Sequence, residues 1–183
     1  MCDATLRDAT AADAPLLARI GVQSWRETYA GLLSQRLLDG LDGNPFHDRR
    51  YWQGVLAEPR LRQWVWIIER RRTPIGLCKF GSADDGDDGG VVDRLYLLRP
   101  AQRQGLGRRL MAAAAHLLAM HDLQPLSVWT LECNQPARAF YERLGGRRLP
   151  RRPVFEDHGA PVFEVGFRWD RPESLGDVSG SRW

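Results

Sequence analysis

The sequence predicts a mixed α/β fold that combines an antiparallel hairpin with one strand–helix–strand crossover. Two runs rich in aromatic and β-branched residues, Arg62–Arg70 and Pro74–Ser82, flank a short turn, which is typical of a hairpin. A strand at Val91–Leu98 then leads into a long Ala- and Leu-rich helix at Gly105–His121, and a strand at Pro125–Glu132 follows. Strands that alternate with helices in this order are typical of mixed α/β domains.

The amino-terminal part is predicted to be mostly helical. After a short strand at ATLRDAT, a first helix is expected over Ala11–Tyr29, with Thr10 or Asp13 as its cap. Two shorter helices are expected at Leu32–Leu41 and at Pro45–Ala57, where the proline suits a first helical turn.

The carboxyl-terminal part is predicted to hold one helix and two strands. The helix spans Asn134–Gly145, with the asparagine as its cap, and the strands span Arg147–Pro153 and Val162–Trp169. The acidic stretch Ala83–Gly90 is expected to be a hairpin loop, because it lacks the distant carboxylate that a calcium loop needs.

Length and composition favour one soluble domain over residues 1–170, followed by a flexible tail at 171–183. The net charge of +3 is too small for a dedicated nucleic-acid-binding protein, although clusters at Arg70–Arg72, Arg103–Arg109 and Arg147–Arg152 could attract an anion. The three cysteines are scattered, so a reducing cytoplasm and no bound metal are expected. No apolar run approaches the roughly 20 residues that span a bilayer, so no membrane association is expected.

The segment RPAQRQGLGRRL, which begins at Arg99, places two glycines directly before a good helix. Backbone N–H groups at a helix N-terminus favour negative charge, and glycine lets phosphate oxygens approach the backbone closely. A Walker loop and a dinucleotide fingerprint do not fit, because the Gly-Lys-Ser/Thr ending is absent and Leu110 stands where a third glycine is required. Taken alone, the segment leaves open a glycine-rich turn with solvated arginines.

Two motifs together resemble those of the GNAT superfamily of N-acetyltransferases. Gln102, Gly105 and Gly107 match its coenzyme-binding pattern, Gln/Arg-x-x-Gly-x-Gly/Ala. The segment ECNQPARAFYERLGGRRL matches its second motif, at Asn134, Ala137, Phe140, Tyr141 and Gly145. The match in motif covers Val91–Arg148, and the match in element order covers Thr5–Trp169.

The sequence departs from the family pattern at two places before the helix. Arg103 stands where the family often has glycine, and Pro100 lies one residue later than the usual proline. Neither departure removes an N–H group from the loop. The resemblance implies a mostly antiparallel sheet of six to seven strands, flanked by helices and splayed between the fourth and fifth strands.

The resemblance implies that acetyl-coenzyme A is the co-substrate. Its pyrophosphate would lie on the amides of the loop, and its pantetheine arm would lie between the splayed strands. A backbone N–H of Leu97 or Leu98 would polarise the thioester carbonyl, and Asn134 would bind the arm or only cap its helix. The expected coenzyme-binding residues are Leu97, Leu98, Gln102, Arg103, Gln104, Gly105, Leu106, Gly107, Arg108 and Asn134.

The chemistry of amine acetylation requires an acid and a base. Tyr141 matches the family tyrosine that protonates the leaving thiolate, and the alternative is a tyrosine of the core. An amine attacks only in its neutral form, and Asp93, on the same strand face as Val91 and Leu97, is the best candidate base. The alternatives left open are an ion pair of Asp93 with Arg94 or Arg147, and a base acting through water, Glu69 or Glu132.

The acceptor side is predicted within the first helix pair. Trp25, Glu27 and Tyr29 could shape a pocket for an amine, and helix packing is the alternative for Trp25 and Tyr29. The resemblance implies a primary amine of a small molecule or a peptide as the partner, and homodimers are common in the family. No nucleic acid and no membrane are expected as partners. The resemblance thus predicts an N-acetyltransferase, and the alternative is a non-catalytic sensor of acyl-coenzyme A.

Overall fold

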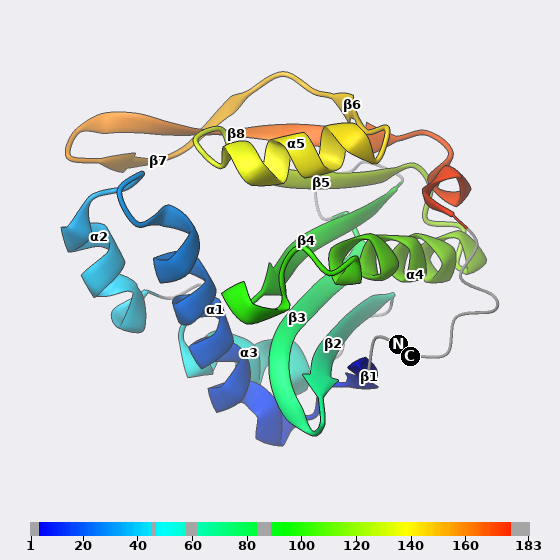
Figure 1. The fold of residues 1–183 in the computed structure, drawn as a ribbon, viewed down its shortest axis with the longest axis horizontal. Helices are drawn as coiled ribbons and strands as arrows, with labels where there is room; N and C mark the ends of the chain where they lie inside the picture. Colours follow the sequence, from blue (N-terminus) through cyan, green and yellow to red (C-terminus); the bar gives the residue numbers. More distant parts are fainter. Residues whose placement is uncertain (1–3, 45–46, 58–61, 84–88, 177–183) are drawn as a thin grey trace. The chain divides into compact units, whose positions relative to one another are not determined.

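The computed structural model describes residues 4–44, 47–57, 62–83 and 89–176, and it confirms the predicted mixed α/β fold (Figure 1). Eight strands follow the order β1–β2–β3–β4–β5–β8–β6, with β7 paired to β8 outside this path. The strands are β1 (Ala4–Asp8), β2 (Gln63–Arg70), β3 (Thr73–Ser82), β4 (Gly90–Leu97), β5 (Leu126–Leu131), β6 (Arg147–Arg148), β7 (Arg152–Asp157) and β8 (Ala160–Trp169). The helices are α1 (Ala14–Tyr29), α2 (Gln35–Asp39), α3 (Arg49–Ala57), α4 (Leu106–Met120) and α5 (Gln135–Arg143).

The described chain divides into two compact units. The first takes its residues from Met1–Lys79 and Arg94–Gly107, and the second from Phe80–Asp93 and Arg108–Gly180. Strands β3 and β4 and helix α4 contribute residues to both units. The single domain proposed from the sequence for residues 1–170 stays a prediction, and each unit is described by itself.

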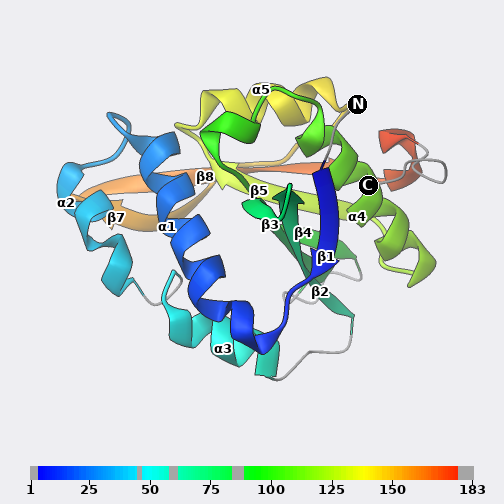
Figure 2. The ribbon, with the colours of Figure 1, turned by 60° about the horizontal axis from the view of Figure 1, so that its bottom comes forward.

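The core of the first unit lies between helices α1 and α3 and strands β2 and β3. Its buried members are Ala14, Leu17, Ile20, Trp52, Val65, Ile67 and Leu77. Figure 2 shows α1 and α3 side by side, and the two helices are in contact. Helix α1 is preceded by the short 3-10 helix η1 (Ala11–Asp13), of which Thr10 is the N-cap, and the Thr10 N–H donates to the Asp13 carboxylate at 2.8 Å. Asp13 stands at the N-cap of α1 itself but makes no side-chain cap bond there.

The two shorter helices of the first unit begin later than the sequence suggests. The stretch predicted as a helix at Leu32–Leu41 holds α2, which Ser34 caps, followed by the 3-10 helix η2 (Gly40–Gly43). Helix α3 begins at Arg49, and the predicted start at Pro45 lies outside the described residues.

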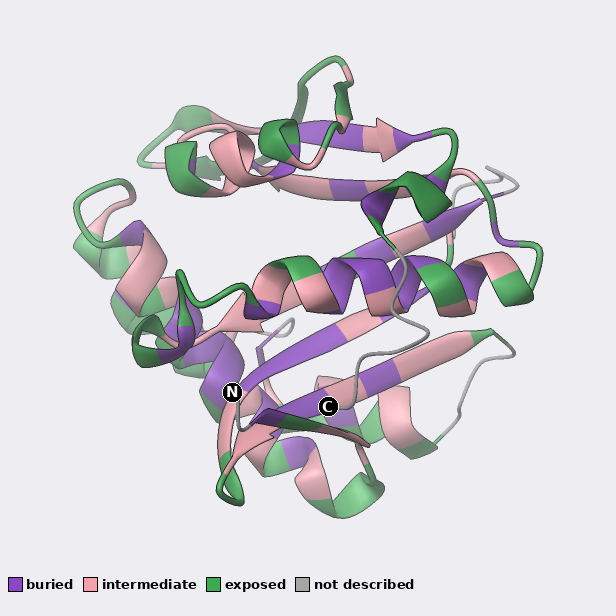
Figure 3. Cartoon of the chain, turned by 45° about the vertical axis from the view of Figure 1, so that its right-hand side comes forward, coloured by how far each residue is buried: buried purple, intermediate pink, exposed green. Residues whose placement is uncertain are grey.

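In the second unit, helices pack against one face of strands that the sequence predicted. Helix α4 buries one side, and Figure 3 shows it as a buried stripe beside exposed turns. A Cβ on Gly90 would lie 2.9 Å from Leu118, so this glycine allows β4 to approach α4 closely. Helix α5 packs on β8, where the rings of Tyr141 and Phe167 lie 5.5 Å apart.

Strands β4 and β5 are parallel, whereas β5, β6 and β7 each pair antiparallel with β8. The parallel register joins Gly90–Val92 of β4 to Leu126–Val128 of β5. The single strand predicted at Arg147–Pro153 is instead two strands, β6 and β7. The reason is Pro150, which has no N–H to donate and interrupts the ladder.

The predicted flexible tail is ordered at its beginning. Pro172–Leu175 form a 3-10 helix, and Leu175 is 3% exposed. Residues beyond Gly176 lie outside the described part of the chain. No helix among the described residues combines the length and the hydrophobicity that crossing a bilayer requires.

Candidate functional site

The predicted phosphate-binding loop connects β4 to α4 in the first unit. Strand β4 ends at Leu97, the 3-10 helix η3 (Arg99–Ala101) follows, and α4 begins at Leu106. Arg103 and Gly105 adopt left-handed conformations, with φ of 60° and 79°. A Cβ at Gly105 would meet nothing within 4 Å, so glycine is favoured here by the backbone conformation and not by crowding. The loop therefore turns sharply into a helix N-terminus, whose first N–H groups have no partner within the helix.

Two glutamine side chains hold this loop in shape. The Gln102 amide donates to the Leu97 carbonyl at 2.8 Å, and the Gln104 amide donates to the Pro100 carbonyl at 2.7 Å. The Gln104 carbonyl oxygen also accepts a bond of 2.5 Å from the guanidinium of Arg70, on β2. Both glutamines had been expected at the coenzyme; the structure shows their side chains bonded to the protein itself.

Two exposed arginines lie at the loop and at the beginning of α4. Arg103 and Arg108 have no hydrogen-bond or ion-pair partner among the residues that the structure describes. The sequence from Arg94 to His121 contains no Asp or Glu. Unpaired guanidinium groups beside free backbone N–H groups favour an anion such as a phosphate.

The two candidate oxyanion donors differ in what they contact. The Leu98 N–H donates to the Ile75 carbonyl of β3 at 2.9 Å and is therefore occupied by the sheet. Neighbouring residues of a strand direct their N–H groups to opposite edges, so the Leu97 N–H points away from β3. A Cβ on Gly76 would overlap the Tyr96 carbonyl, so this glycine lets β3 and β4 approach each other closely beside Leu97. Leu97 is thus the better of the two candidates.

The residues predicted for the acceptor pocket lie at the carboxyl end of α1. The Trp25 indole N–H donates to the Tyr96 hydroxyl at 3.0 Å, and the Trp25 ring lies 4.7 Å from that of Tyr29. The Glu27 carboxylate accepts the backbone N–H of Arg99 at 2.8 Å. The contacts of Trp25 and Tyr29 fit the packing role that the sequence left open as the alternative for these two residues. A role of Trp25, Glu27 and Tyr29 in acceptor binding stays a prediction.

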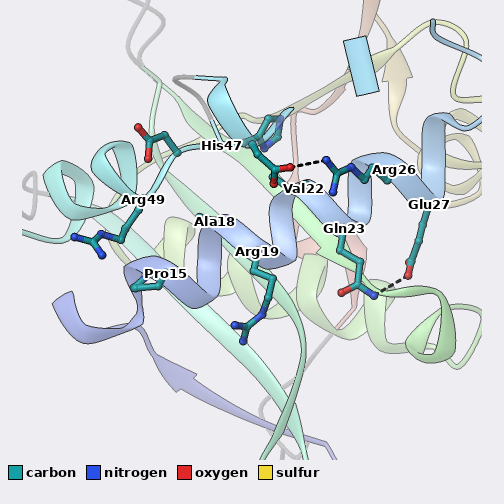
Figure 4. Close-up of a pocket in the computed structure, with 11 residues that line it drawn as sticks. Pro15, Ala18, Arg19, Val22, Gln23, Arg26, Glu27, His47 and Arg49 are labelled. Atoms are coloured by element: carbon teal, nitrogen blue, oxygen red, sulfur yellow. Dashed lines mark hydrogen bonds and ion pairs between the residues drawn. The ribbon is translucent and has the colours of Figure 1, made fainter. Parts of the chain in front are cut away.

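A groove of about 560 Å³ lies on the outer side of α1, against the segment that begins α3 (Figure 4). It is lined by Pro15, Ala18, Arg19, Val22, Gln23, Arg26, Glu27, Asp42, His47, Asp48 and Arg49. His47 is buried against Trp25, and its pKa is lowered to about 4 by this burial and by the nearby charge of Arg94. Glu27 is the one lining residue that the sequence had singled out for the site.

In the second unit, the predicted active-site residues lie on β4, on α5 and at the junction before α5. Asn134 is buried and accepts the N–H of Ala137 at 3.2 Å, which confirms it as a helix cap. Tyr141 is 6% exposed, and its ring contacts those of Phe140, Phe167 and Trp169. Burial raises the pKa of the Cys133 thiol, which lies beside Asn134, so this thiol is a weak nucleophile at neutral pH.

The candidate bases have distinct surroundings. Asp93 is exposed on β4, while Glu132 accepts hydrogen bonds from Arg148 and Arg151, and Glu69 accepts one from Arg7. Of the two arginines considered as partners of Asp93, Arg147 pairs with Asp170 and Arg94 stacks over Tyr51 at 4.3 Å. An ion pair of either arginine with Asp93 stays a prediction.

Some residues at the site gave no signal in the sequence. The sequence indicated Arg70 only as part of a cluster that could attract an anion. Its contact with Gln104 could not be foreseen, because the two residues are far apart in the chain and meet only in the folded protein. Tyr96 is part of no motif. Because successive side chains of a strand point to opposite faces of the sheet, the sequence predicts only that Tyr96 and Leu97 lie on opposite faces. No group of three His, Cys, Asp or Glu side chains suited to a metal ion occurs among the described residues.

Comparison with known proteins identifies the family. The family "Acetyltransferase (GNAT) family" matches residues 24–146 of this chain. The chain belongs to the GNAT acetyltransferase family. It is 32% identical to an uncharacterized N-acetyltransferase of Bacillus subtilis (strain 168), YuaI, over 90% of this chain and 92% of the relative. It is also 32% identical to a probable N-acetyltransferase of Mycobacterium tuberculosis, Rv2775, over 89% of this chain and 91% of the relative.

The fold agrees with that of solved GNAT proteins. The PaiA N-acetyltransferase of Thermoplasma acidophilum, whose structure contains coenzyme A, superposes with a TM-score of 0.70 at 16% identity, over 88% of this chain and 97% of that one. Membership of this family confirms the prediction of an acyltransferase.

Proposed function

We propose that this GNAT protein transfers the acetyl group of acetyl-coenzyme A to a primary amine, by direct attack within a ternary complex. The observation that supports coenzyme binding most strongly is the loop over Gln102–Gly107. It turns through Gly105 into the beginning of α4, and Arg103 and Arg108 beside it have no partner among the described residues. This is the combination of N–H groups and charge that a pyrophosphate requires.

The residues present fit the coenzyme by the chemistry of their donors. Backbone amides from Arg103 to Arg108 would hold the pyrophosphate, and Arg103 and Arg108 would add charge at the pyrophosphate or the 3′-phosphate. The side chains of Gln102 and Gln104 would hold the loop in shape for this contact, as their bonds to Leu97 and Pro100 suggest. Asn134 would bind the pantetheine arm through the part of its amide that does not cap α5.

The bound coenzyme supplies an activated thioester, and the residues of the chain supply the other parts of the reaction. The Leu97 N–H would donate to the carbonyl oxygen as negative charge develops on it. Asp93 would accept a proton from the amine, directly or through water, and Tyr141 would donate a proton to the departing sulfur. The proposal for Tyr141 rests on its position in the second family motif, and its packed ring would fix the direction of the hydroxyl.

The proposed acceptor is a primary amine of a small molecule or a peptide, in the cytoplasm. Trp25 and Tyr29 are candidates for one wall of its pocket. A non-catalytic sensor of acyl-coenzyme A is the second candidate, because the burial of Tyr141 also fits a tyrosine of the core, which need not transfer a proton.

The release of free thiol from acetyl-coenzyme A, measured with a panel of small amines and peptides, tests the proposal. We expect release that depends on both the protein and an amine, with a matching acetylated product detected by mass spectrometry. Reactions without amine give the background of simple hydrolysis. Binding of coenzyme A without turnover on any amine or peptide would support the sensor instead.

A further inference from the structure

We propose that Glu27 is a positioning residue for the coenzyme-binding loop and not a contact of the acceptor amine. The inference rests on the proposed function, because it concerns the loop that would hold the coenzyme. It differs from the prediction made from the sequence, which placed Glu27 in the acceptor pocket.

Glu27 and Arg99 are joined by two hydrogen bonds in opposite directions. The Glu27 carboxylate oxygen Oε2 accepts the backbone N–H of Arg99 at 2.8 Å, and the Arg99 guanidinium donates to the backbone carbonyl of Glu27 at 3.1 Å. The other carboxylate oxygen, Oε1, accepts the side-chain amide of Gln23 at 2.9 Å, as Figure 4 shows. Both oxygens are thus held by donors of the protein, which favours a fixed carboxylate.

Arg99 is the first residue of the segment that forms the loop. Its neighbour Leu98 is fixed to β3 through the bond to Ile75, and the N–H of Ala101 bonds back to Leu98 at 2.8 Å. The Gln104 amide then bonds to the carbonyl of Pro100. A residue that fixes Arg99 therefore fixes the start of η3, and through η3 the position of the loop. Arg70, which contacts Gln104, is a second support from β2.

The charge of Glu27 is better suited to this role than to a contact with the coenzyme. A carboxylate that touched a phosphate would repel it, whereas a carboxylate that accepts a backbone N–H at the beginning of a helical turn stabilises that turn. The loop itself supplies no acidic residue, since the sequence from Arg94 to His121 contains none. Glu27 reaches Arg99 from α1, a helix far away in the sequence, and so connects α1 to the loop.

Three single variants separate a positioning role from the alternatives. Glu27→Ala removes the acceptor for the Arg99 N–H. Glu27→Gln removes the charge but keeps an amide oxygen that can accept this N–H, while the Gln23 amide can rotate to complement it. The matched control is Arg26→Met, because Arg26 is the adjacent residue and makes bonds of 2.7 Å to Asp42 and 3.2 Å to the Leu38 carbonyl, neither of which leads to the loop.

Two measurements on the full chain apply to each variant. The first is the hydrogen exchange of the Arg99 backbone amide, followed by NMR without ligand. The second is the dissociation constant of coenzyme A, measured by calorimetry. In Glu27→Ala we expect faster exchange at Arg99 and a dissociation constant raised by about tenfold, the loss typical of one hydrogen bond to a charged group. The dissociation constant of Glu27→Gln should lie within about threefold of the wild-type value, and that of Arg26→Met should equal the wild-type value.

The outcomes distinguish this inference from the proposed function. Coenzyme affinity in Glu27→Ala equal to that of the wild type would overturn the positioning role alone. If both Glu27 variants have an unchanged affinity for coenzyme A and a raised KM for the amine, Glu27 contacts the acceptor, as the sequence predicted. Failure of the wild-type protein to bind coenzyme A would overturn the proposed function, and the positioning role would fall with it.

Discussion

The indole N–H of Trp25 donates to the hydroxyl of Tyr96 at 3.0 Å, and this bond joins α1 to β4 within the first unit. The ring of Trp25 also lies 5.0 Å from that of His47. One side chain predicted for the acceptor pocket is therefore held by a strand that precedes the loop proposed to bind the coenzyme. The contact has consequences for stability that can be measured without knowing the acceptor.

The hydrogen bond between Trp25 and Tyr96 should contribute about 1 kcal/mol to the free energy of unfolding, the usual net value for a partly buried neutral bond. Tyr96→Phe removes the acceptor and Trp25→Phe removes the donor. Urea denaturation of both variants and of the double variant gives their coupling energy. A coupling energy near zero would show that the bond contributes nothing to stability.

Gly105→Ala should weaken coenzyme binding and lower the free energy of unfolding by about 1 kcal/mol, because Gly105 has a φ of 79° that an L-residue adopts only with strain. Thermal denaturation and calorimetry with coenzyme A measure the two effects. The control is Gly54→Ala on α3, where an added Cβ meets nothing within 4 Å and the backbone is helical. This control should stabilise the protein by roughly 0.5–1 kcal/mol and leave coenzyme binding unchanged.

Tyr141→Phe should lower kcat by about 100-fold, the usual contribution of a general acid, while the dissociation constant of coenzyme A changes little. The ring contacts with Phe167 and Trp169 would survive this substitution, so the fold should be retained. Steady-state kinetics and calorimetry on the same preparation separate the two quantities. Unchanged turnover, or an equal loss of turnover and of affinity, would make Tyr141 a structural residue.

The stability of the protein should fall as the pH is lowered from about 6.5 toward 4, and His47 should account for part of the loss. Burial and the charge of Arg94 lower the pKa of His47 in the folded state from 6.5 to about 4. Between these values the unfolded chain binds a proton that the folded chain does not, so unfolding is favoured. The variant His47→Phe keeps an aromatic ring against Trp25 but cannot bind the proton. Between pH 6.5 and 4, urea denaturation should show that its free energy of unfolding falls by about 2 kcal/mol less than that of the wild type. If the free energy of unfolding falls equally with pH in the two proteins, His47 does not account for the loss.

Periodic patterns and local motifs accounted for most of the elements. Alternation in Arg62–Arg70 and Pro74–Ser82 gave β2 and β3, and the glycine pair before an Ala-rich run gave the beginning of α4. These features depend on residues close together in the chain, where local sterics and capping decide the outcome. The break between β6 and β7 was missed, although Pro150, which has no N–H to donate to a sheet, lies within the predicted strand.

The roles of single side chains were harder to predict, because each depends on what the fold brings beside it. Asn134 could be recognised as a cap, since its partner Ala137 lies three residues away. Glu27 could not be assigned, because Arg99 is remote in the sequence and the bond goes to its backbone. A backbone partner leaves no pattern of residue types that a sequence could display.

The sequence by itself determined the family of this protein, the order of its elements and the glycine loop, since these follow from local patterns and from two motifs in a fixed order. Only the tertiary structure decided that the Leu98 N–H bonds to β3, which leaves Leu97 as the better candidate donor. It also decided that Glu27 accepts the N–H of Arg99 and that Arg70 donates to Gln104. The physical reason is that a hydrogen bond depends on distance and direction in space. Folding sets both by packing α1 and β2 beside residues that lie far from them in the chain.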